Sequence, residues 1–397
     1  NQIKNVANPT DAQDAVTKAY IHELEQKLER ISKSLENRGY INNEIVWQNA
    51  DEYEYNPFTK IRTNWYSSLV DHADNTIVAG IQADYNYDPQ GQLSTVVKKL
   101  DPNGAIIWQK NYILNIGSYN IVVNLYENNS KSGYIVHGVK GVKDITTYET
   151  VDYSSVIFEI SSDGEFLIKK EIDNTYATGS NPTSDGYVVV GYNFDNDQLI
   201  LKKLSNSLVE ISNTIFPINE NFKTKDIIPF GNDFIISATD GGNAVMIRID
   251  LSNSNIVWET SLSEKFISKI IGLNNNIVIA GYDDSGVRTF AYAGILNSDG
   301  ALINETTVDA NFFSHLAKDS QENLYFLGSI NEQSNFYFGN KGYGRDDVFI
   351  YKTNSDIQGV WAKNFGGSRD DGGYSNDSSC GINVKSNNNI VIFYMSR

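Results

Sequence analysis

The residues that could carry acid–base, nucleophilic or metal chemistry are few and scattered. The sequence holds four histidines, His22, His72, His137 and His315, and one cysteine, Cys380. They form no HExxH, HxH or His/Cys cluster of the kind that binds a transition metal, and a single cysteine excludes an intramolecular disulfide. The sequence also lacks the GxSxG and P-loop motifs. We expect His137 to pack between strands, which leaves His72 and His315 as the histidines able to reach a ligand.

Oxygen-rich loops are the second place where chemistry could occur. Asp195 and Asp197 lie in the segment YNFDNDQ, and Asp370 and Asp371, followed by Asp377, lie in SRDDGGYSNDSS. Calcium prefers several oxygen ligands from a flexible loop, although neither segment has EF-hand spacing. These aspartates are weak candidates for Ca²⁺, and no other cofactor is expected. Carboxylates are numerous enough for an acid–base pair, but the sequence does not identify two that converge.

Aromatic side chains give the best candidates for ligand binding, because exposed tyrosines are common in recognition surfaces. One group lies near the start of the repeats described below, and the other lies in the segment NEQSNFYFGNKGYGRD, residues 331–346. The candidate ligand-binding residues are Tyr53, Tyr55, Tyr85, Tyr87, Phe336, Tyr337 and Tyr343.

Charge and hydropathy limit the classes of partner. The net charge is −17, which argues against nucleic acid, because affinity for the phosphate backbone depends on clustered Lys and Arg. No apolar run approaches the length of a membrane span. The chain begins on a polar segment, and we expect that a signal or lipoprotein leader has been removed before it.

The elements that must position these residues are repeated. A short hydrophobic burst occurs seven times, at intervals typical of propeller blades. The copies are NTIVAG (75–80), GYIVHG (133–138), GYVVVG (186–191), DFIISA (233–238), NIVIAG (276–281), NLYFLG (323–328) and NIVIFY (389–394). Each predicts a strand, and neighbouring apolar segments predict three more strands per repeat, the outermost marked by tryptophan. The repetition favours packing between blades for these tryptophans, which are Trp47, Trp108, Trp258 and Trp361.

The expected fold is an all-β, seven-bladed β-propeller preceded by an N-terminal helix. The seventh burst ends near the C-terminus without outer strands, whereas EIVWQN (44–49) has the outer-strand pattern without inner strands before it. We therefore expect residues 44–49 to complete the C-terminal blade and close the ring, which removes an unpaired edge. The predicted domains are 1–39, a helical stalk or docking helix, and 40–397, the propeller.

Residues 10–38 are predicted to form one amphipathic, coiled-coil-like helix. Thr10 and Gln13 make a capping-box pattern, and Gly39 is a stop signal. Apolar residues recur at alternating steps of three and four, which is a heptad seam. Its members are Ile21, Leu24, Leu28, Ile31 and Leu35. The seam predicts either a homo-oligomeric stem, such as a trimer, or a helix docked on a protein partner or on its own propeller.

Two segments resemble known families. NVANPTDAQDAVTKAY (5–20) is similar to the segment that opens helical stems in phage tail fibres and in exported proteins of Bacteroidetes-type bacteria. Residues 313–394 resemble the SBBP repeat family of seven-bladed β-propellers, through HLAKDSQENLYFLGS (315–329), DDVFIYKT (346–353) and GVWAKNFGGSRDDGGYS (359–375). The first resemblance implies an extracellular stalk. The second implies architecture, and in its pattern the aspartate after FGGS suits turn capping.

These observations predict a non-catalytic binding or scaffold protein at the extracellular or outer-membrane surface of a bacterium. The propeller would be the recognition platform for a protein or a glycan, and the N-terminal helix would serve oligomerisation or docking. The alternatives are a polysaccharide-active propeller enzyme, which would need carboxylates or a His/Tyr pair meeting in the channel, and a phage receptor-binding fibre protein. A fold of this kind does not decide among them.

Overall fold

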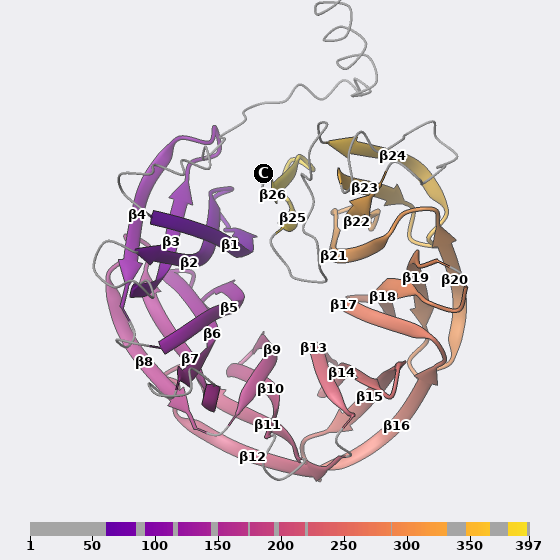
Figure 1. Cartoon of the computed structure of the whole chain (residues 1–397), viewed down its shortest axis with the longest axis horizontal. Coiled ribbons are helices and arrows are strands. Elements are labelled where there is room, and N and C mark those ends of the chain that lie inside the picture. Colours follow the sequence, from indigo (N-terminus) through magenta and orange to yellow (C-terminus); the bar gives the residue numbers. More distant parts are fainter. Residues whose placement is uncertain are drawn as a thin grey trace, which may run out of the picture. The chain divides into compact units, whose positions relative to one another are not determined.

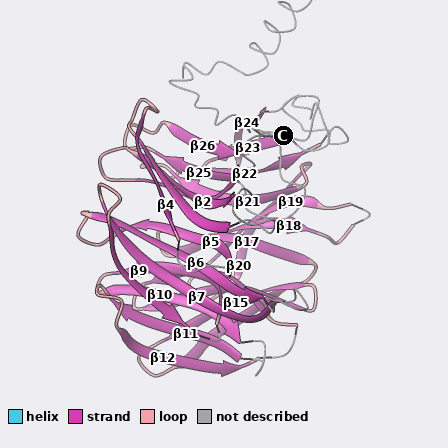
Figure 2. Cartoon of the chain, turned by 60° about the vertical axis from the view of Figure 1, so that its left-hand side comes forward, coloured by secondary structure: helices cyan, strands magenta, loops and turns pink. Residues whose placement is uncertain are grey.

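The computed structural model describes residues 61–84, 92–113, 118–143, 150–173, 175–193, 198–218, 221–286, 288–331, 347–365 and 380–394. The chain divides into two units, Asn1–Val46 and Trp47–Arg397, and every described residue belongs to the second. These residues form strands and turns without a helix (Figure 2). The described part of the chain therefore contains no helix that could cross a membrane.

Six antiparallel sheets of four strands each are arranged in a ring, and the first strand of each sheet lies on the inner side (Figure 1). Each sheet is a simple meander in chain order. Its connections alternate between the two ends of the sheet, because successive strands are antiparallel. The strands of the first three sheets are β1 (Ile61–Val70), β2 (Thr76–Asp84), β3 (Gln92–Leu100), β4 (Ile106–Tyr112); β5 (Ser118–Glu127), β6 (Gly133–Lys143), β7 (Thr150–Ser161), β8 (Phe166–Ile172); and β9 (Tyr176–Thr183), β10 (Gly186–Asn193), β11 (Gln198–Ser205), β12 (Glu210–Pro217). Those of the next three are β13 (Lys223–Phe230), β14 (Asp233–Asp240), β15 (Asn243–Asp250), β16 (Asn255–Leu262); β17 (Lys265–Leu273), β18 (Asn276–Asp283), β19 (Phe290–Leu296), β20 (Leu302–Val308); and β21 (Phe312–Lys318), β22 (Leu324–Ile330), β23 (Asp347–Thr353), β24 (Gly359–Phe365).

The predicted number of blades is wrong: the described chain has six four-stranded blades, not seven. The last burst forms β26 (Ile390–Tyr394), which pairs with β25 (Cys380–Val384) in a sheet of two strands. Each burst marks the second strand of a sheet, so counting bursts counts second strands and not complete blades. The predicted closing strand at 44–49 and the predicted helix at 10–38 lie outside the described residues, and neither is shown.

The two-stranded sheet lies between the first and sixth blades (Figure 1), with β25 against both β1 and β21. Toward the first blade, Asn383 Nδ2 donates to Ser68 Oγ at 2.6 Å. Toward the sixth blade, Ser320 Oγ donates to Asn388 Oδ1 at 3.0 Å. The two ends of the blade series are therefore bridged by this short sheet.

The core is divided into clusters that lie between successive sheets. In the cluster between the fifth and sixth blades, for example, Phe313 and Phe326 are fully buried. A second strand has neighbouring sheets on both faces, so it contains a continuous apolar run instead of alternating with polar residues. This is why the burst was the strongest signal in the sequence, and why all seven residues of β22 are buried.

Every blade carries a β-bulge in its first strand and another in its fourth. In the first strand the bulge brings a carbonyl oxygen against the end of the burst: a Cβ at Gly281 would lie 1.7 Å from Phe266 O, and one at Gly328 would lie 1.8 Å from Phe312 O. Glycine avoids this contact at both positions, and Ala238 stands at the corresponding position of the fourth blade. The extra residue of each fourth-strand bulge is a half-exposed aliphatic; these residues are Ile107, Leu167, Ile211, Val257, Ile303 and Val360. Bulges on both edge strands interrupt the flat edges that would pair with other chains.

Candidate recognition face

The tryptophans of the outer strands pack between blades, as predicted. The indole nitrogen of Trp108 donates to the carbonyl oxygen of Ser162 in the next blade at 3.0 Å, and that of Trp258 donates to Ser298 at 2.9 Å. Trp361 packs in the cluster between the sixth blade and β25–β26. These side chains hold neighbouring sheets together. Trp47 lies outside the described residues.

His137 is a core residue, which confirms the prediction. Its side chain is fully buried on β6, and Nδ1 lies 2.7 Å from Ser180 Oγ of the next blade. The hydroxyl of Tyr126 contacts the same serine. Burial lowers the pKa of His137 to about 3, so the ring is neutral at physiological pH. His72 is exposed and pairs with Glu127 across the first two blades, where it joins blades instead of forming a site.

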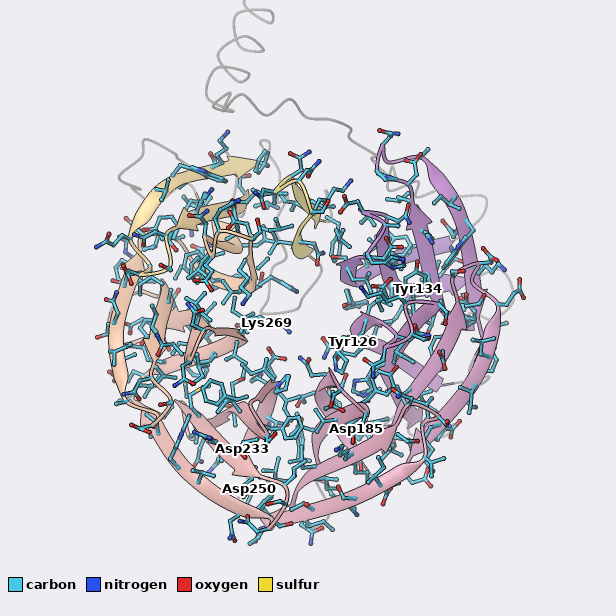
Figure 3. All side chains as sticks on the ribbon, turned by 180° about the vertical axis from the view of Figure 1, so that it is seen from behind. Tyr126, Tyr134, Asp185, Asp233, Asp250 and Lys269 are labelled. Atoms are coloured by element: carbon cyan, nitrogen blue, oxygen red, sulfur yellow. The ribbon has the colours of Figure 1, made fainter. Side chains whose placement is uncertain are left out.

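A polar group on the inner strands is the nearest approach to a catalytic arrangement. Asp226, Lys269 and His315 follow the first-strand bulge in three successive blades, and Figure 3 shows Lys269 on the inner side of the ring. Lys269 Nζ lies 3.1 Å from Asp226 Oδ1, and the Ile270 amide donates to Asp226 Oδ2 at 3.1 Å. Burial, and secondarily the charge of Lys269, lower the pKa of His315 to about 3.

This polar group joins blades and is not a glycosidase pair. The six residues that follow the first-strand bulges are Ser67, Asn124, Gly179, Asp226, Lys269 and His315. Only one of them is a carboxylate, and a lysine neutralises it, whereas glycoside hydrolysis requires two carboxylates flanking the bond. Within the described residues no three His, Cys, Asp or Glu side chains group to hold a metal ion.

The aromatic candidates from the sequence lie outside the described residues. The same holds for the calcium candidates and the helical seam. The residues concerned are Tyr53, Tyr55, Tyr85, Tyr87, Phe336, Tyr337, Tyr343, Asp195, Asp197, Asp370, Asp371, Asp377, Ile21, Leu24, Leu28, Ile31 and Leu35. The strand ends next to several of these segments lie on one side of the ring. Asp84 pairs with both Ile61 and Gln92, and Ile330 pairs with Asp347. We call this side, where first and third strands begin and second strands end, the loop face, and the opposite side the turn face.

The loop face carries a tyrosine cluster between the second and third blades. Tyr153 is near the start of β7, Tyr176 starts β9 and Tyr192 is near the end of β10. The ring centroids of Tyr153 and Tyr176 are 5.1 Å apart with an edge-on geometry, and those of Tyr176 and Tyr192 are 5.2 Å apart. Tyr153 and Tyr176 are partly exposed, whereas burial raises the pKa of Tyr192.

A second aromatic cluster lies on the loop face in the fifth blade. Phe266 and Tyr282 stack with centroids 4.6 Å apart and planes 10° apart, and both are partly exposed. The Arg288 guanidinium lies 4.8 Å from the centroid of Phe290, and Arg288 also pairs with Asp309 at 3.0 Å. Such flat, amphipathic rings can stack on a partner with little loss of side-chain freedom.

The sequence contains a local signal for these clusters. Tyr192 and Tyr282 directly follow the glycines that end two bursts, in the dipeptides Gly191-Tyr192 and Gly281-Tyr282. A residue after the burst is at the end of a second strand and therefore on the loop face. Recognising that partner residues come from neighbouring strands required the three-dimensional register.

No family model matches the chain and no curated protein sequence matches it, so the SBBP resemblance stays a prediction. Among solved structures the chain is similar to hydrazine synthase from Kuenenia stuttgartiensis, with 8% identity, a TM-score of 0.53 and coverage of 84% of this chain and 96% of that chain. It is also similar to the propeller of Dos1, with 9% identity, a TM-score of 0.46 and coverage of 77% and 72%. A putative 6-phosphogluconolactonase from Bacteroides uniformis has 10% identity, a TM-score of 0.48 and coverage of 75% and 83%. At such identities the likeness concerns the fold alone, a β-propeller.

Proposed function

We propose that this β-propeller is a non-catalytic binding protein and that its loop face recognises a protein partner. The observation that carries the proposal is the pair of partly exposed aromatic clusters on that face, one around Tyr153 and Tyr176 and one around Phe266 and Tyr282. Aromatic residues are the side chains most enriched in the energetic centres of protein interfaces.

The architecture supports such a role because it presents these rings on a rigid support. Each cluster joins the ends of strands that are hydrogen-bonded along their length, and burial of one side of each ring fixes its orientation. A preorganised surface loses little entropy on association. The inner-strand group of Asp226, Lys269 and His315 offers no second carboxylate, so the geometry does not favour the alternative of a polysaccharide-active enzyme.

We further propose that the protein acts at the bacterial cell surface and that its N-terminal helix, through the seam of Leu24 and Leu28, forms an oligomeric stem. The resemblance of residues 5–20 to exported stem segments supports this. Several copies of one recognition face on a stem would raise avidity without new contacts. Light scattering of the full chain carrying Leu24→Glu and Leu28→Glu tests it: a trimer should become a monomer, and an unchanged mass would contradict the stem.

Binding to the cell envelope fraction of the source organism tests the loop face. The double variant Tyr153→Ser, Phe266→Ser should be retained at least about tenfold less than the wild-type chain, because it loses hot-spot contacts. The matched control Ile256→Ser, Val257→Ser changes two half-exposed apolar residues of an outer strand instead and should bind as the wild type does. Equal retention of all three proteins would overturn the proposal. Release of reducing sugar from envelope polysaccharide by the wild type would favour the enzyme.

A further inference from the structure

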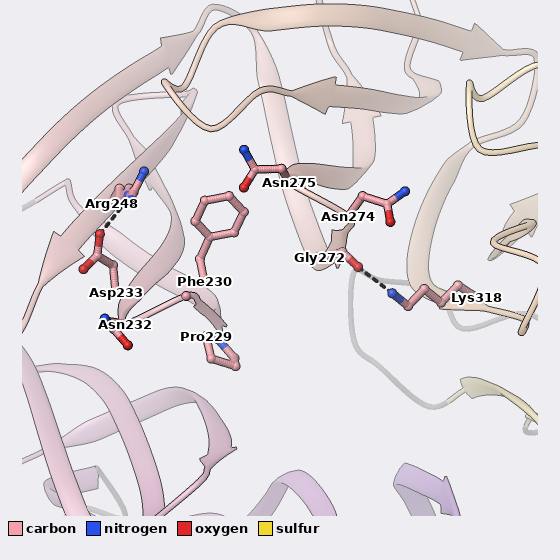
Figure 4. A pocket seen from close by; sticks show the side chains of 10 residues that line it. Pro229, Phe230, Asn232, Asp233, Arg248, Gly272, Asn274, Asn275 and Lys318 are labelled. Carbon is pink, nitrogen blue, oxygen red and sulfur yellow. Dashed lines mark hydrogen bonds and ion pairs between the residues drawn. The ribbon is translucent and has the colours of Figure 1, made fainter.

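A pocket of about 420 Å³ (Figure 4) opens at the hairpins of the turn face, whereas the aromatic clusters lie on the loop face. It lies between the fourth and fifth blades, at the β13–β14 and β17–β18 hairpins, and is bordered by the end of β21. The side chains that the argument uses are Pro229, Phe230, Asn232, Arg248, Asn275 and Lys318. Its volume is within the range of small-ligand sites, which is about 300–1,000 Å³.

The pocket exists because two short hairpins are adjacent. Phe230 pairs with Asp233 and Leu273 pairs with Asn276, so only Gly231-Asn232 and Asn274-Asn275 connect the strands. In the sixth blade the corresponding turn is longer, because Lys318 pairs with Leu324 and the segment from Asp319 to Asn323 closes on itself. The shorter turns leave open the volume that the longer turn fills in its blade.

An ion pair that recurs around the ring is altered at this pocket. In three blades a third-strand lysine pairs with an aspartate of the first hairpin, and these pairs are Lys99–Asp71, Lys203–Asp185 and Lys352–Asp319. In the fourth blade the base is Arg248, whose Nε lies 2.7 Å from Asp233 Oδ2. In the fifth blade the equivalent residue is Ile295, which faces no such pair.

Two of the three guanidinium nitrogens of Arg248 are hydrogen-bonded within the protein, which fixes the orientation of the group. Nε bonds Asp233, Nη1 donates to Ser298 O at 3.0 Å, and the group lies 5.2 Å from the centroid of the Phe230 ring. Among the described residues Nη2 has no hydrogen-bond partner. A lysine, with a single nitrogen, could hold the aspartate but could not also present a fixed second donor.

The rest of the pocket presents amides and a second cation. Lys318 Nζ donates one hydrogen bond to Gly272 O at 2.9 Å, which leaves further N–H groups. Figure 4 shows Lys318 across the pocket from Arg248, with Phe230 and Asn275 between them. The amides of Asn232 and Asn275 are exposed and bond no other described residue. The charged side chains that line the pocket are Arg248, Lys318 and Asp233, a net of one positive charge, and at its edge the Glu322 carboxylate accepts a hydrogen bond from Asn274 at 2.8 Å.

We propose that this pocket binds a carboxylated sugar, such as a hexuronate unit. The ligand carboxylate would accept hydrogen bonds from Arg248 Nη2, with Lys318 adding to the positive potential. The hydroxyl groups would bond the amides of Asn232 and Asn275, and the apolar face of the sugar ring would lie on Pro229. A planar guanidinium favours a planar carboxylate, amides bond hydroxyls as both donors and acceptors, and an exposed proline covers C–H groups. The site is independent of the loop face.

Titration calorimetry with D-glucuronate, D-glucose and inorganic phosphate tests the pocket on the full chain. We expect glucuronate to bind with a Kd of about 1 mM, and glucose at least about tenfold more weakly because it lacks the carboxylate. Phosphate should compete poorly with glucuronate. Phosphate binding as tight as glucuronate binding would mean an anion site without sugar recognition and would overturn the proposal, as would the absence of glucuronate binding at concentrations well above that Kd.

Two substitutions separate recognition from folding. Arg248→Lys keeps the ion pair with Asp233 in the form that other blades use, so the protein should fold, yet glucuronate affinity should fall at least about tenfold. The reciprocal control Lys203→Arg, in the third blade, should leave glucuronate binding unchanged. Asn275→Ala should weaken glucuronate binding and leave the affinity for simple carboxylates such as acetate unchanged. Equal glucuronate affinity in Arg248→Lys and the wild type would refute the site, whatever the loop-face experiment shows.

Discussion

The turn face and the loop face of this propeller are built by different rules. On the turn face several described turns repeat one pattern: a polar side chain at the first position accepts from the amides two and four residues later, as Asp71 does from Ala73 and Asn75. The same pattern recurs at Asp101, Asn297, Asp319 and Asn354. On the loop face the described strand ends carry aromatic clusters that join different strands.

The difference shows where stability and recognition are located. A turn-face side chain that bonds its own backbone and the next blade is needed for folding, so its replacement should cost free energy of unfolding. The loop-face rings of Tyr153 and Phe266 are partly exposed, and their removal should cost partner binding instead. The following predictions begin with the largest expected effect on stability.

Of the substitutions on the turn face, Asp71→Ala should reduce stability most. The carboxylate of Asp71 is buried and accepts from Ala73 N and Asn75 N at 2.9 Å each and from the Tyr134 hydroxyl at 2.8 Å, while Lys99 Nζ lies 3.6 Å away. Its loss leaves buried donors without an acceptor, which should lower the free energy of unfolding by about 3–5 kcal/mol. Urea denaturation measures this change. Asp163→Ala, an exposed residue of the same face, should change it by less than about 0.5 kcal/mol.

The interior between the two faces should make stability depend on pH. Burial lowers the folded-state pKa of His137 to about 3, below its unfolded value near 6.5. The unfolded chain therefore binds more protons between these values, and stability falls as pH falls below about 6.5, by about 2 kcal/mol at pH 5. His137→Gln, which can still bond Ser180 but does not titrate, should show a shallower loss in denaturation between pH 7 and pH 5. An unchanged slope would contradict a neutral, buried His137.

Asp71 and His137 should affect stability in different pH ranges. Its burial raises the pKa, but hydrogen bonds from Asn75, Tyr134 and backbone amides outweigh burial and leave the pKa below the usual value of 3.8. Its contribution to stability is therefore complete above pH 4 and is lost only at lower pH. A denaturation profile that falls in two steps is the expected result. His137→Gln should reduce the upper step without removing it, because the low pKa of His315 contributes to the same step.

Trp108→Phe should sharpen the comparison between turns and packing. The substitution keeps most of the apolar contact with the next blade but removes the hydrogen bond from Nε1 to Ser162 O, so the free energy of unfolding should fall by about 1 kcal/mol. Trp258→Phe should lower the free energy of unfolding by a similar amount, because the equivalent hydrogen bond in the fourth blade joins Trp258 to Ser298. A large difference between the two variants would show that the repeat does not distribute stability evenly.

The sequence predicted the elements that depend on local or repeated chemistry. The second strands were found because burial on both faces produces a continuous apolar run, as in β22, and Trp108 and Trp258 were correctly assigned to blade packing because they recur at one position. The number of blades was wrong because a burst reports a second strand whether or not the outer strands follow it. The loop-face clusters were missed because Tyr153 and Tyr176 belong to different blades, 23 positions apart, and no local pattern links them.

Replacing the exposed rings of the loop face should change stability much less than Asp71→Ala does. Tyr153→Ser with Phe266→Ser removes two partly exposed rings that pack against Tyr176 and Tyr282, and an aromatic pair contributes about 0.5–1.5 kcal/mol. Because the strands beneath keep their hydrogen bonds, the free energy of unfolding should fall by no more than about 2 kcal/mol for both substitutions together. The midpoint of urea denaturation, measured beside Asp71→Ala, checks this. If the loop-face variant lost as much stability as Asp71→Ala, its rings would belong to the folding core, and the division of the two faces into one for folding and one for recognition would be wrong.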